Sequence, residues 1–118
     1  MKATKAKTEE LDLYLMANIR PESSGLPMII WVSEHGNARH GPRIKVSLQH
    51  GTKLDPYRTA SVSIEDVPEL VAGNLSPPDL RAVQEYVRLN RATLLAYWTG
   101  EIDTVKLASR LKALSPSR

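Results

Sequence analysis

Apolar and polar residues alternate most regularly over residues 43–49, where Ile44, Val46 and Leu48 are separated by polar side chains. Successive side chains of a strand point to opposite faces, so this pattern predicts a strand with one apolar face and one basic, polar face. Residues 28–32 form a continuous apolar run rich in β-branched side chains, which predicts a strand covered on both faces. The Gly- and Pro-containing loop 33–42 between them is longer than a tight hairpin turn.

A third alternating segment spans residues 58–64, with Ala60, Val62 and Ile64 on its apolar side. Together the three segments predict an antiparallel three-stranded meander, each strand with one apolar face. Beyond it, residues 67–71 fit either a further short strand or an irregular stretch, and Gly73-Asn74 ends that segment.

Two C-terminal helices are predicted next. Ser76 is suited to cap a helix that begins with Pro77 and runs to Thr99, with Gly100 at its end. A core stripe on this helix consists of Leu80, Val83, Val87, Leu94 and Trp98, with Ala82, Tyr86 and Leu95 at its edges. A shorter helix starts at Asp103, and its apolar face comprises Leu107, Ala108, Leu111 and Leu114. The predicted fold class is therefore α+β, with the meander packed against these helices.

The N-terminal region has two interpretations. Residues 1–7 are expected to be disordered, and Thr8 is suited to cap a short helix. The helical stripe would contain Leu11, Tyr14, Leu15, Asn18 and Ile19. The alternation of Leu11, Leu13 and Leu15 supports an edge strand instead, but the longer helical match favours a helix. A second copy docking on this helix would give a homodimer, a point that the sequence leaves open. Residues 21–27 are predicted to form a loop.

Composition narrows the class of protein. The 118 residues predict one domain, 1–118, which is large enough to form a hydrophobic core without disulfides or structural metals. The absence of cysteine excludes disulfides, thiolate zinc sites and cysteine nucleophiles, and it fits a reducing cytosol. No apolar run approaches the roughly 18 residues of a membrane span, and no secretory signal opens the sequence. We therefore expect a cytoplasmic protein without a membrane partner.

Charge is unevenly distributed although the net charge is only +3. Basic residues dominate the hairpin, whereas residues 64–79 carry acidic residues and no basic ones. Because Lys and Arg bind phosphates, the hairpin is a candidate nucleic-acid or protein interface. Its candidate partner-binding residues are Arg39, Arg43, Lys45, Gln49 and Arg58. The second strand carries no aromatic residue on its polar face, so base stacking has no platform there. An ordinary solvated face is the competing interpretation.

Aromatic residues near the end of the long helix offer a third interpretation, a protein-interaction module. Tyr97 and Trp98 would anchor a partner, because aromatic residues dominate interface hot spots. Core packing is the favoured interpretation for both Trp98 and Trp31.

The hairpin loop holds the only candidate chemistry. Glu34, His35 and His40 would serve as an acid/base or metal-binding group in a metal- or His-dependent hydrolase or nuclease. His50 follows a strand of seven residues at about 3.3 Å each, which places it roughly 20 Å from the loop. No recognised metal-ligand spacing and no nucleotide or nucleophile motif is present, so we expect no metal site and no cofactor.

The segment 30–35 (Ile-Trp-Val-Ser-Glu-His) and the helix 87–98, which ends in Leu-Leu-Ala-Tyr-Trp, resemble a family of short bacterial proteins known only as a domain of unknown function. That family pairs an early hairpin, whose loop resembles Asp-His-x-Pro-Pro-His-x-His, with a C-terminal Leu-Leu-x-x-Trp-like helix. Here loop 34–42 lacks the Pro-Pro pair and the third histidine. The resemblance covers roughly residues 27–114 and implies a fold layout and a toxin–antitoxin-like setting.

These observations favour a small macromolecule-binding module over an enzyme. The binding face would be the polar side of the hairpin together with its loop. The hydrolase or nuclease that uses Glu34, His35 and His40 is the alternative.

Overall fold

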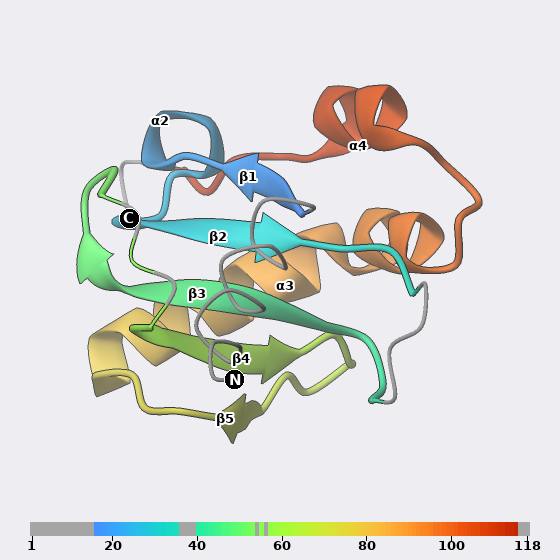
Figure 1. The fold of residues 1–118 in the computed structure, drawn as a ribbon. Coiled ribbons are helices and arrows are strands. Elements are labelled where there is room, and N and C mark those ends of the chain that lie inside the picture. Colours follow the sequence, from blue (N-terminus) through green and yellow to red (C-terminus); the bar gives the residue numbers. More distant parts are fainter. Residues whose placement is uncertain (1–15, 36–39, 54, 56, 116–118) are drawn as a thin grey trace, which may run out of the picture.

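The structure is a computed structural model that describes residues 16–35, 40–53, 55 and 57–115. It contains a five-stranded antiparallel sheet in the order β1-β2-β3-β4-β5, so each strand pairs with its neighbours in sequence (Figure 1). The strands are β1 (Ala17–Ile19), β2 (Met28–Val32), β3 (Arg43–His50), β4 (Thr59–Ser63) and β5 (Leu70–Ala72). The helices are α2 (Pro21–Ser24), α3 (Pro77–Trp98) and α4 (Thr104–Arg110). The predicted α+β class is confirmed.

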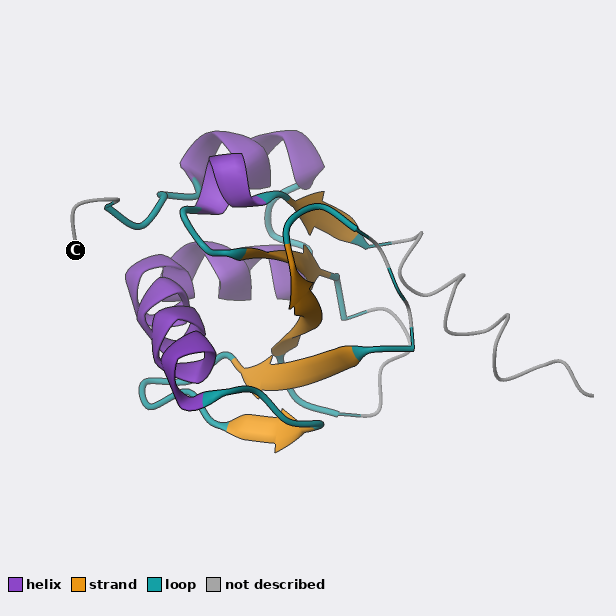
Figure 2. Ribbon diagram, turned by 90° about the vertical axis from the view of Figure 1, so that its left-hand side faces the viewer, coloured by secondary structure: helices purple, strands orange, loops and turns teal. Residues whose placement is uncertain are grey.

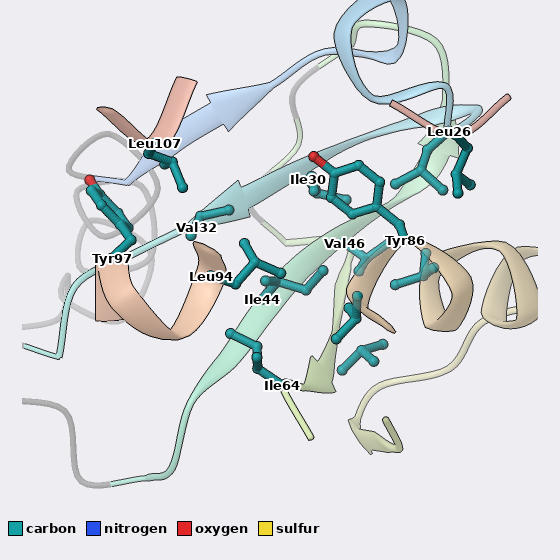
Figure 3. Close-up of a cluster of buried hydrophobic side chains, with 14 of the residues drawn as sticks. Leu26, Ile30, Val32, Ile44, Val46, Ile64, Tyr86, Leu94, Tyr97 and Leu107 are labelled. Atoms are coloured by element: carbon teal, nitrogen blue, oxygen red, sulfur yellow. The ribbon is translucent and has the colours of Figure 1, made fainter. Parts of the chain in front are cut away.

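The helices gather on one side of the sheet, and α3 crosses that side (Figure 2). The main core lies between this side of the sheet and the helices. It contains the alternate residues of β2 and β3 together with Val83, Tyr86 and Leu94 of α3 (Figure 3). Ile30, Val46 and Val62 are fully buried there. Burial of this apolar face is the main stabilising contribution to the fold. We call this side of the sheet the inner face and the opposite side the outer face.

The sheet is larger than the predicted three-stranded meander. β5 adds to β4 through the pairs Ser61↔Ala72 and Val62↔Leu70, so the strand interpretation of residues 67–71 is correct for Leu70–Ala72. At the other edge, β1 pairs with β2. Both added strands are only three residues long. Such short strands carry too little periodicity to be recognised from local sequence.

The predicted N-terminal helix is wrong at its C-terminal end. Asn18 and Ile19 belong to β1, where they pair with Trp31 and Ile30 of β2. Pro21 disfavours helical backbone in the residue before it, and Arg20 is extended (φ −84°, ψ 160°). The chain therefore stays extended up to Arg20 and turns into α2 at Pro21, inside the predicted loop. The rest of that prediction, and the disorder expected for residues 1–7, lies outside the described residues.

The two C-terminal helices begin where the sequence predicts. The Ser76 hydroxyl accepts a hydrogen bond from the Asp79 N–H (3.3 Å), and the Asp103 carboxylate accepts one from the Lys106 N–H (2.9 Å). Both caps satisfy backbone donors that a helix start leaves without a partner. The predicted apolar face of α4 is partly wrong, because Ala108 is exposed and the helix ends at Arg110. Leu111 and Leu114 therefore lie beyond the helix, and Leu111 has extended backbone angles (φ −67°, ψ 136°).

Aromatic residues of α3 are buried more deeply than predicted. Tyr86, expected at the edge of the stripe, is fully buried, while Leu80 is only half-buried. Tyr97 and Trp98 are 5% and 6% exposed. Core packing is thus confirmed for Trp98 and also for Trp31, which is 1% exposed. Tyr97 and Trp98 are therefore not available as protruding anchors for a partner.

The Tyr86 hydroxyl has no hydrogen-bond partner within the described part of the chain. A buried hydroxyl without a partner keeps its desolvation cost. We therefore expect Tyr86→Phe to raise the free energy of unfolding by about 1 kcal/mol in urea denaturation. Tyr97→Phe is the matched control: it removes a hydroxyl that lies 3.0 Å from the Thr104 hydroxyl and should cost about 1 kcal/mol. Equal effects of the two substitutions would contradict this assignment.

The same hydroxyl should make the free energy of unfolding fall at alkaline pH. Burial raises the pKa of Tyr86 from 10.0 to about 12. The native protein therefore keeps a proton that the unfolded chain loses, and the Tyr86 contribution falls as pH rises from about 10 to about 12. The full loss for this shift is about 3 kcal/mol, at 1.36 kcal/mol per pKa unit, and about 2 kcal/mol of it is expected between pH 9 and pH 11.5. Tyr86→Phe should lack this loss when denaturation curves at pH 9 and pH 11.5 are compared; an identical decline in both proteins would refute it.

Candidate binding face and hairpin-loop histidines

Two basic side chains stand next to each other on the outer face. Ile44 and Val46 lie in the main core, so strand alternation turns Arg43 and Lys45 of β3 to the opposite side. The two residues are separated by about 7 Å along the strand. Arg43 pairs with Ser63 of β4, and Lys45 pairs with Ser61. The predicted alternation thus holds for residues 43–46, but it is wrong further along the strand, where Leu48 is 37% exposed and Ser47 is buried.

The outer face carries no carboxylate on its strands. None of the five strands contains an aspartate or glutamate, as the described ranges show. Within the described residues neither Arg43 nor Lys45 lies within 4.0 Å of a carboxylate, since the ion pairs found there join Arg20 to Glu22, His50 to Asp79, and Arg91 to Asp66. The Arg91–Asp66 contact ties one acidic residue of the β4–β5 loop to α3. The positive charge of β3 is thus not neutralised by a described carboxylate.

A row of residues crosses the outer face at Lys45. It is formed by the successive pairs Asn18↔Trp31, Trp31↔Lys45, Lys45↔Ser61 and Ser61↔Ala72. Trp31 of β2 therefore lies beside Lys45 of β3. The sequence of β3 alone does not reveal this aromatic neighbour. Trp31 and Ile29 are 1% and 2% exposed, and Met16 packs against them. A side chain buried to this extent is not accessible for stacking on a nucleic-acid base.

The other predicted binding residues have different positions. Gln49 is half-buried on β3, where its N–H lies 3.2 Å from the Ser47 hydroxyl. Arg58 is exposed in the turn before β4, at the opposite end of β3 from Arg43. Tyr57 in the same turn is 63% exposed. Arg39 lies outside the described residues. The structure thus places two predicted cations, Arg43 and Lys45, together on one strand.

The two loop histidines both contact Trp98. The ring centroids of His35 and Trp98 are 5.2 Å apart in an edge-on arrangement, and those of His40 and Trp98 are 5.8 Å apart. The His35 N–H also donates to the Trp98 carbonyl (2.8 Å). Glu34 is exposed. Residues 16–35, 40–53, 55 and 57–115 contain no group of three or more His, Asp or Glu arranged to hold a metal ion. These contacts attach the hairpin loop to the end of α3.

His50 lies at the far end of β3 from this loop, as strand length predicts. Its Nε2 atom is 2.9 and 3.1 Å from the two carboxylate oxygens of Asp79 in the first turn of α3. The Asp79 side chain is 16% exposed and that of His50 is 60% exposed. The pair links the sheet to the start of α3 across 29 residues of sequence.

Loss of this link should have a modest effect on stability. We expect Asp79→Ala to lower the free energy of unfolding by about 1 kcal/mol, because it removes both the His50 contact and a carboxylate near the positive end of the helix dipole. Urea denaturation measures the change. Glu65→Ala is the control, since Glu65 is exposed and should change stability by less than about 0.5 kcal/mol. An Asp79→Ala protein as stable as the control would show that the link contributes nothing.

A buried amide in α3 was not predicted at all. Asn90 is 3% exposed and has non-helical backbone angles (φ −113°, ψ 16°) within the helix. Its side chain donates to the Tyr86 carbonyl (3.1 Å) and the Lys112 carbonyl (2.9 Å), and it accepts from the Lys112 N–H (2.7 Å). The signal in the sequence was an asparagine in the middle of the apolar stripe of a long helix, where this residue type is disfavoured.

No protein-family model, no curated protein and no solved structure matches this chain. The resemblance to the family of short bacterial proteins therefore stays a prediction. No helix in the described part of the chain is long and apolar enough to span a membrane. Any functional conclusion has to come from the geometry of the molecule itself.

Proposed function

We propose that this protein is a small binding module whose outer sheet face contacts the phosphate backbone of a nucleic acid. The observation that carries the proposal is the pair Arg43 and Lys45, which share one strand face that has no strand carboxylate. Lys and Arg gain affinity from phosphates through counterion release, and this gain needs cations that are not already paired with protein carboxylates.

The contact is to the backbone rather than to the bases. Trp31, the aromatic residue beside Lys45, is buried, so it offers no stacking surface. Phosphate contacts position a nucleic acid without reading its sequence. The proposed binding is therefore weakly dependent on sequence.

The hydrolase or nuclease alternative finds less support. His35 and His40 pack against Trp98, and the described residues hold no group of three metal ligands. A binding role for the outer face uses residues that the fold places together, whereas the enzyme would need Glu34, His35 and His40 to converge on a substrate.

Fluorescence anisotropy of the full chain with labelled 20-nucleotide strands of two unrelated sequences tests the proposal. We expect binding at low salt, similar affinity for both sequences, and a linear fall of log K with log salt concentration. Competition by poly-glutamate alone, without nucleic-acid binding, would indicate an acidic protein partner and reject the proposal. Absence of binding to either strand at about 50 mM salt would also reject it.

A further inference from the structure

Among the tyrosines and tryptophans that the structure describes, Tyr57 alone is exposed. Its exposed fraction is 63%, whereas Trp31, Tyr86, Tyr97 and Trp98 are at most 6% exposed. A buried ring such as that of Trp31 cannot stack on a nucleic-acid base, but an exposed ring can. The strands of the outer face thus supply phosphate contacts, and Tyr57, outside those strands, is the described ring that a base can reach.

Tyr57 lies in the connection between β3 and β4, at the end of the outer face. The described parts of this connection lie on the side of the sheet opposite to α3 (Figure 2). The register Ser47↔Thr59, continued by two residues, brings Tyr57 to the level of Gln49 on β3. Measured along the strand, Gln49 is four residues or about 13 Å from Lys45. About four stacked nucleotides of one strand cover this distance, at roughly 3.4 Å each.

Hydrogen bonds fix the backbone around Tyr57. The Asp55 carboxylate accepts from the Tyr57 N–H (3.0 Å), and the Asp55 carbonyl accepts from the Arg58 N–H (3.1 Å). An aspartate that bonds to the backbone two residues on is a common way to stabilise a turn. The Arg58 carbonyl accepts from the Leu48 N–H (3.0 Å), which joins the turn to β3. A ring on a fixed backbone loses less conformational entropy on binding than one on a mobile loop.

Two basic residues accompany Tyr57 in this connection. Lys53 and Arg58 are exposed, and within the described part of the chain neither lies within 4.0 Å of a carboxylate. Together with Arg43 and Lys45 they extend the positive charge from β3 into the turn. Cations that follow the phosphates, combined with an exposed aromatic ring for the bases, are the means by which proteins bind single strands without sequence preference.

We propose that the nucleic acid bound at the outer face is single-stranded, and that one of its unpaired bases stacks on Tyr57 while Arg43 and Lys45 contact its phosphates. This inference rests on the proposed function and names the class of nucleic acid. In a duplex each base is paired and stacked on its neighbours, so freeing a base for Tyr57 has an energetic cost. A single strand offers free base faces, and stacking on an aromatic ring tolerates every base. Tyr57 therefore adds affinity without adding sequence preference.

Fluorescence anisotropy of the full chain with four labelled probes of 20 nucleotides tests the proposal. The probes are a DNA single strand, an RNA single strand of the same sequence, the DNA duplex, and an abasic DNA strand that keeps the phosphates but lacks the bases. Tyr57→Ala removes the ring, and Tyr57→Phe keeps it as the matched control. Both variants should unfold at the wild-type urea concentration, because the side chain is exposed.

We expect the wild type to bind the single strands more tightly than the duplex. Tyr57→Ala should bind them at least about fivefold more weakly than the wild type, whereas Tyr57→Phe should stay within about twofold. All three proteins should bind the abasic strand equally, and the slope of log K against log salt should not change, because no cation is removed. A loss on only one of the two single strands assigns the site to DNA or to RNA.

Two results overturn this inference while the proposed function stands. One is salt-dependent binding of both single strands that Tyr57→Ala leaves unchanged but that Arg43→Ala combined with Lys45→Ala weakens. The other is tighter binding of the duplex than of either single strand. Absence of binding to all four probes rejects the proposed function, and this inference with it.

Discussion

Replacement of Asn90 by leucine is expected to lower the free energy of unfolding by about 3 kcal/mol. The substitution keeps the size of the side chain but removes three hydrogen bonds, one to the Tyr86 carbonyl and two to the Lys112 backbone. Each buried polar group left without a partner costs about 1–3 kcal/mol. The better helix propensity of leucine recovers only a few tenths of a kcal/mol.

Urea denaturation followed by circular dichroism measures this loss. Gln84→Leu is a graded control on the same helix, because it removes a single hydrogen bond to the Pro68 carbonyl and should cost about 1 kcal/mol. Amide hydrogen exchange distinguishes local detachment of residues 111–115 from destabilisation of the whole protein. If only this segment detaches, exchange at the Leu114 N–H should accelerate more than exchange at the Leu94 N–H. If Asn90→Leu is as stable as the wild type, the hydrogen bonds between the Asn90 amide and the Lys112 backbone do not stabilise the fold.

Combined substitution of Arg43→Ala and Lys45→Ala is expected to have the largest effect on binding. Loss of two phosphate contacts should reduce the slope of log K against log salt by about 1.4 for a single strand, at about 0.7 per phosphate. We expect affinity at 100 mM salt to fall at least about tenfold. Stability should change little, because both residues are only half-buried.

The control for this experiment has the same change in net charge on another surface. Arg81 and Arg88 are exposed on α3, which packs on the inner face. Arg81→Ala combined with Arg88→Ala should leave most of the affinity intact. If both double variants lose affinity and salt slope equally, binding follows net charge alone and the outer face is not the site. His35→Ala should also leave affinity unchanged, whereas a His-dependent enzyme would lose turnover.

Local sequence was sufficient for the elements whose signals are short-ranged. The start of α3 follows from Ser76, Pro77 and Asp79, because a cap, a fixed backbone angle and a first-turn carboxylate act within one helical turn. The alternation along β3 correctly predicted that Ile44 and Val46 are buried and that Arg43 and Lys45 share the other face, but it was wrong for Leu48, which is exposed, and for Ser47, which is buried. The α+β class and the basic strand face were therefore within reach of the sequence.

Pairing between segments that are distant along the chain could not be predicted from local sequence. Ala17–Ile19 became a strand because β2 offered an edge to pair with, and three residues carry no periodicity of their own. The register of β2 and β3 placed Trp31 beside Lys45, a relation between strands that neither strand encodes alone. The candidate binding face was thus predicted in its charges but not in its buried aromatic neighbour.

The sequence by itself determined the caps, the strand alternation and the absence of cysteine chemistry, because each depends on residues close together or on composition. Only the tertiary structure decided the contacts of His50 with Asp79, 29 residues apart, and of Asn90 with Lys112, 22 residues apart. A polar side chain gives no local sign of its partner. Its hydrogen bonds are set when packing brings two separate segments together. In this protein, that packing brought the backbone of Lys112, beyond α4, against the Asn90 amide of α3.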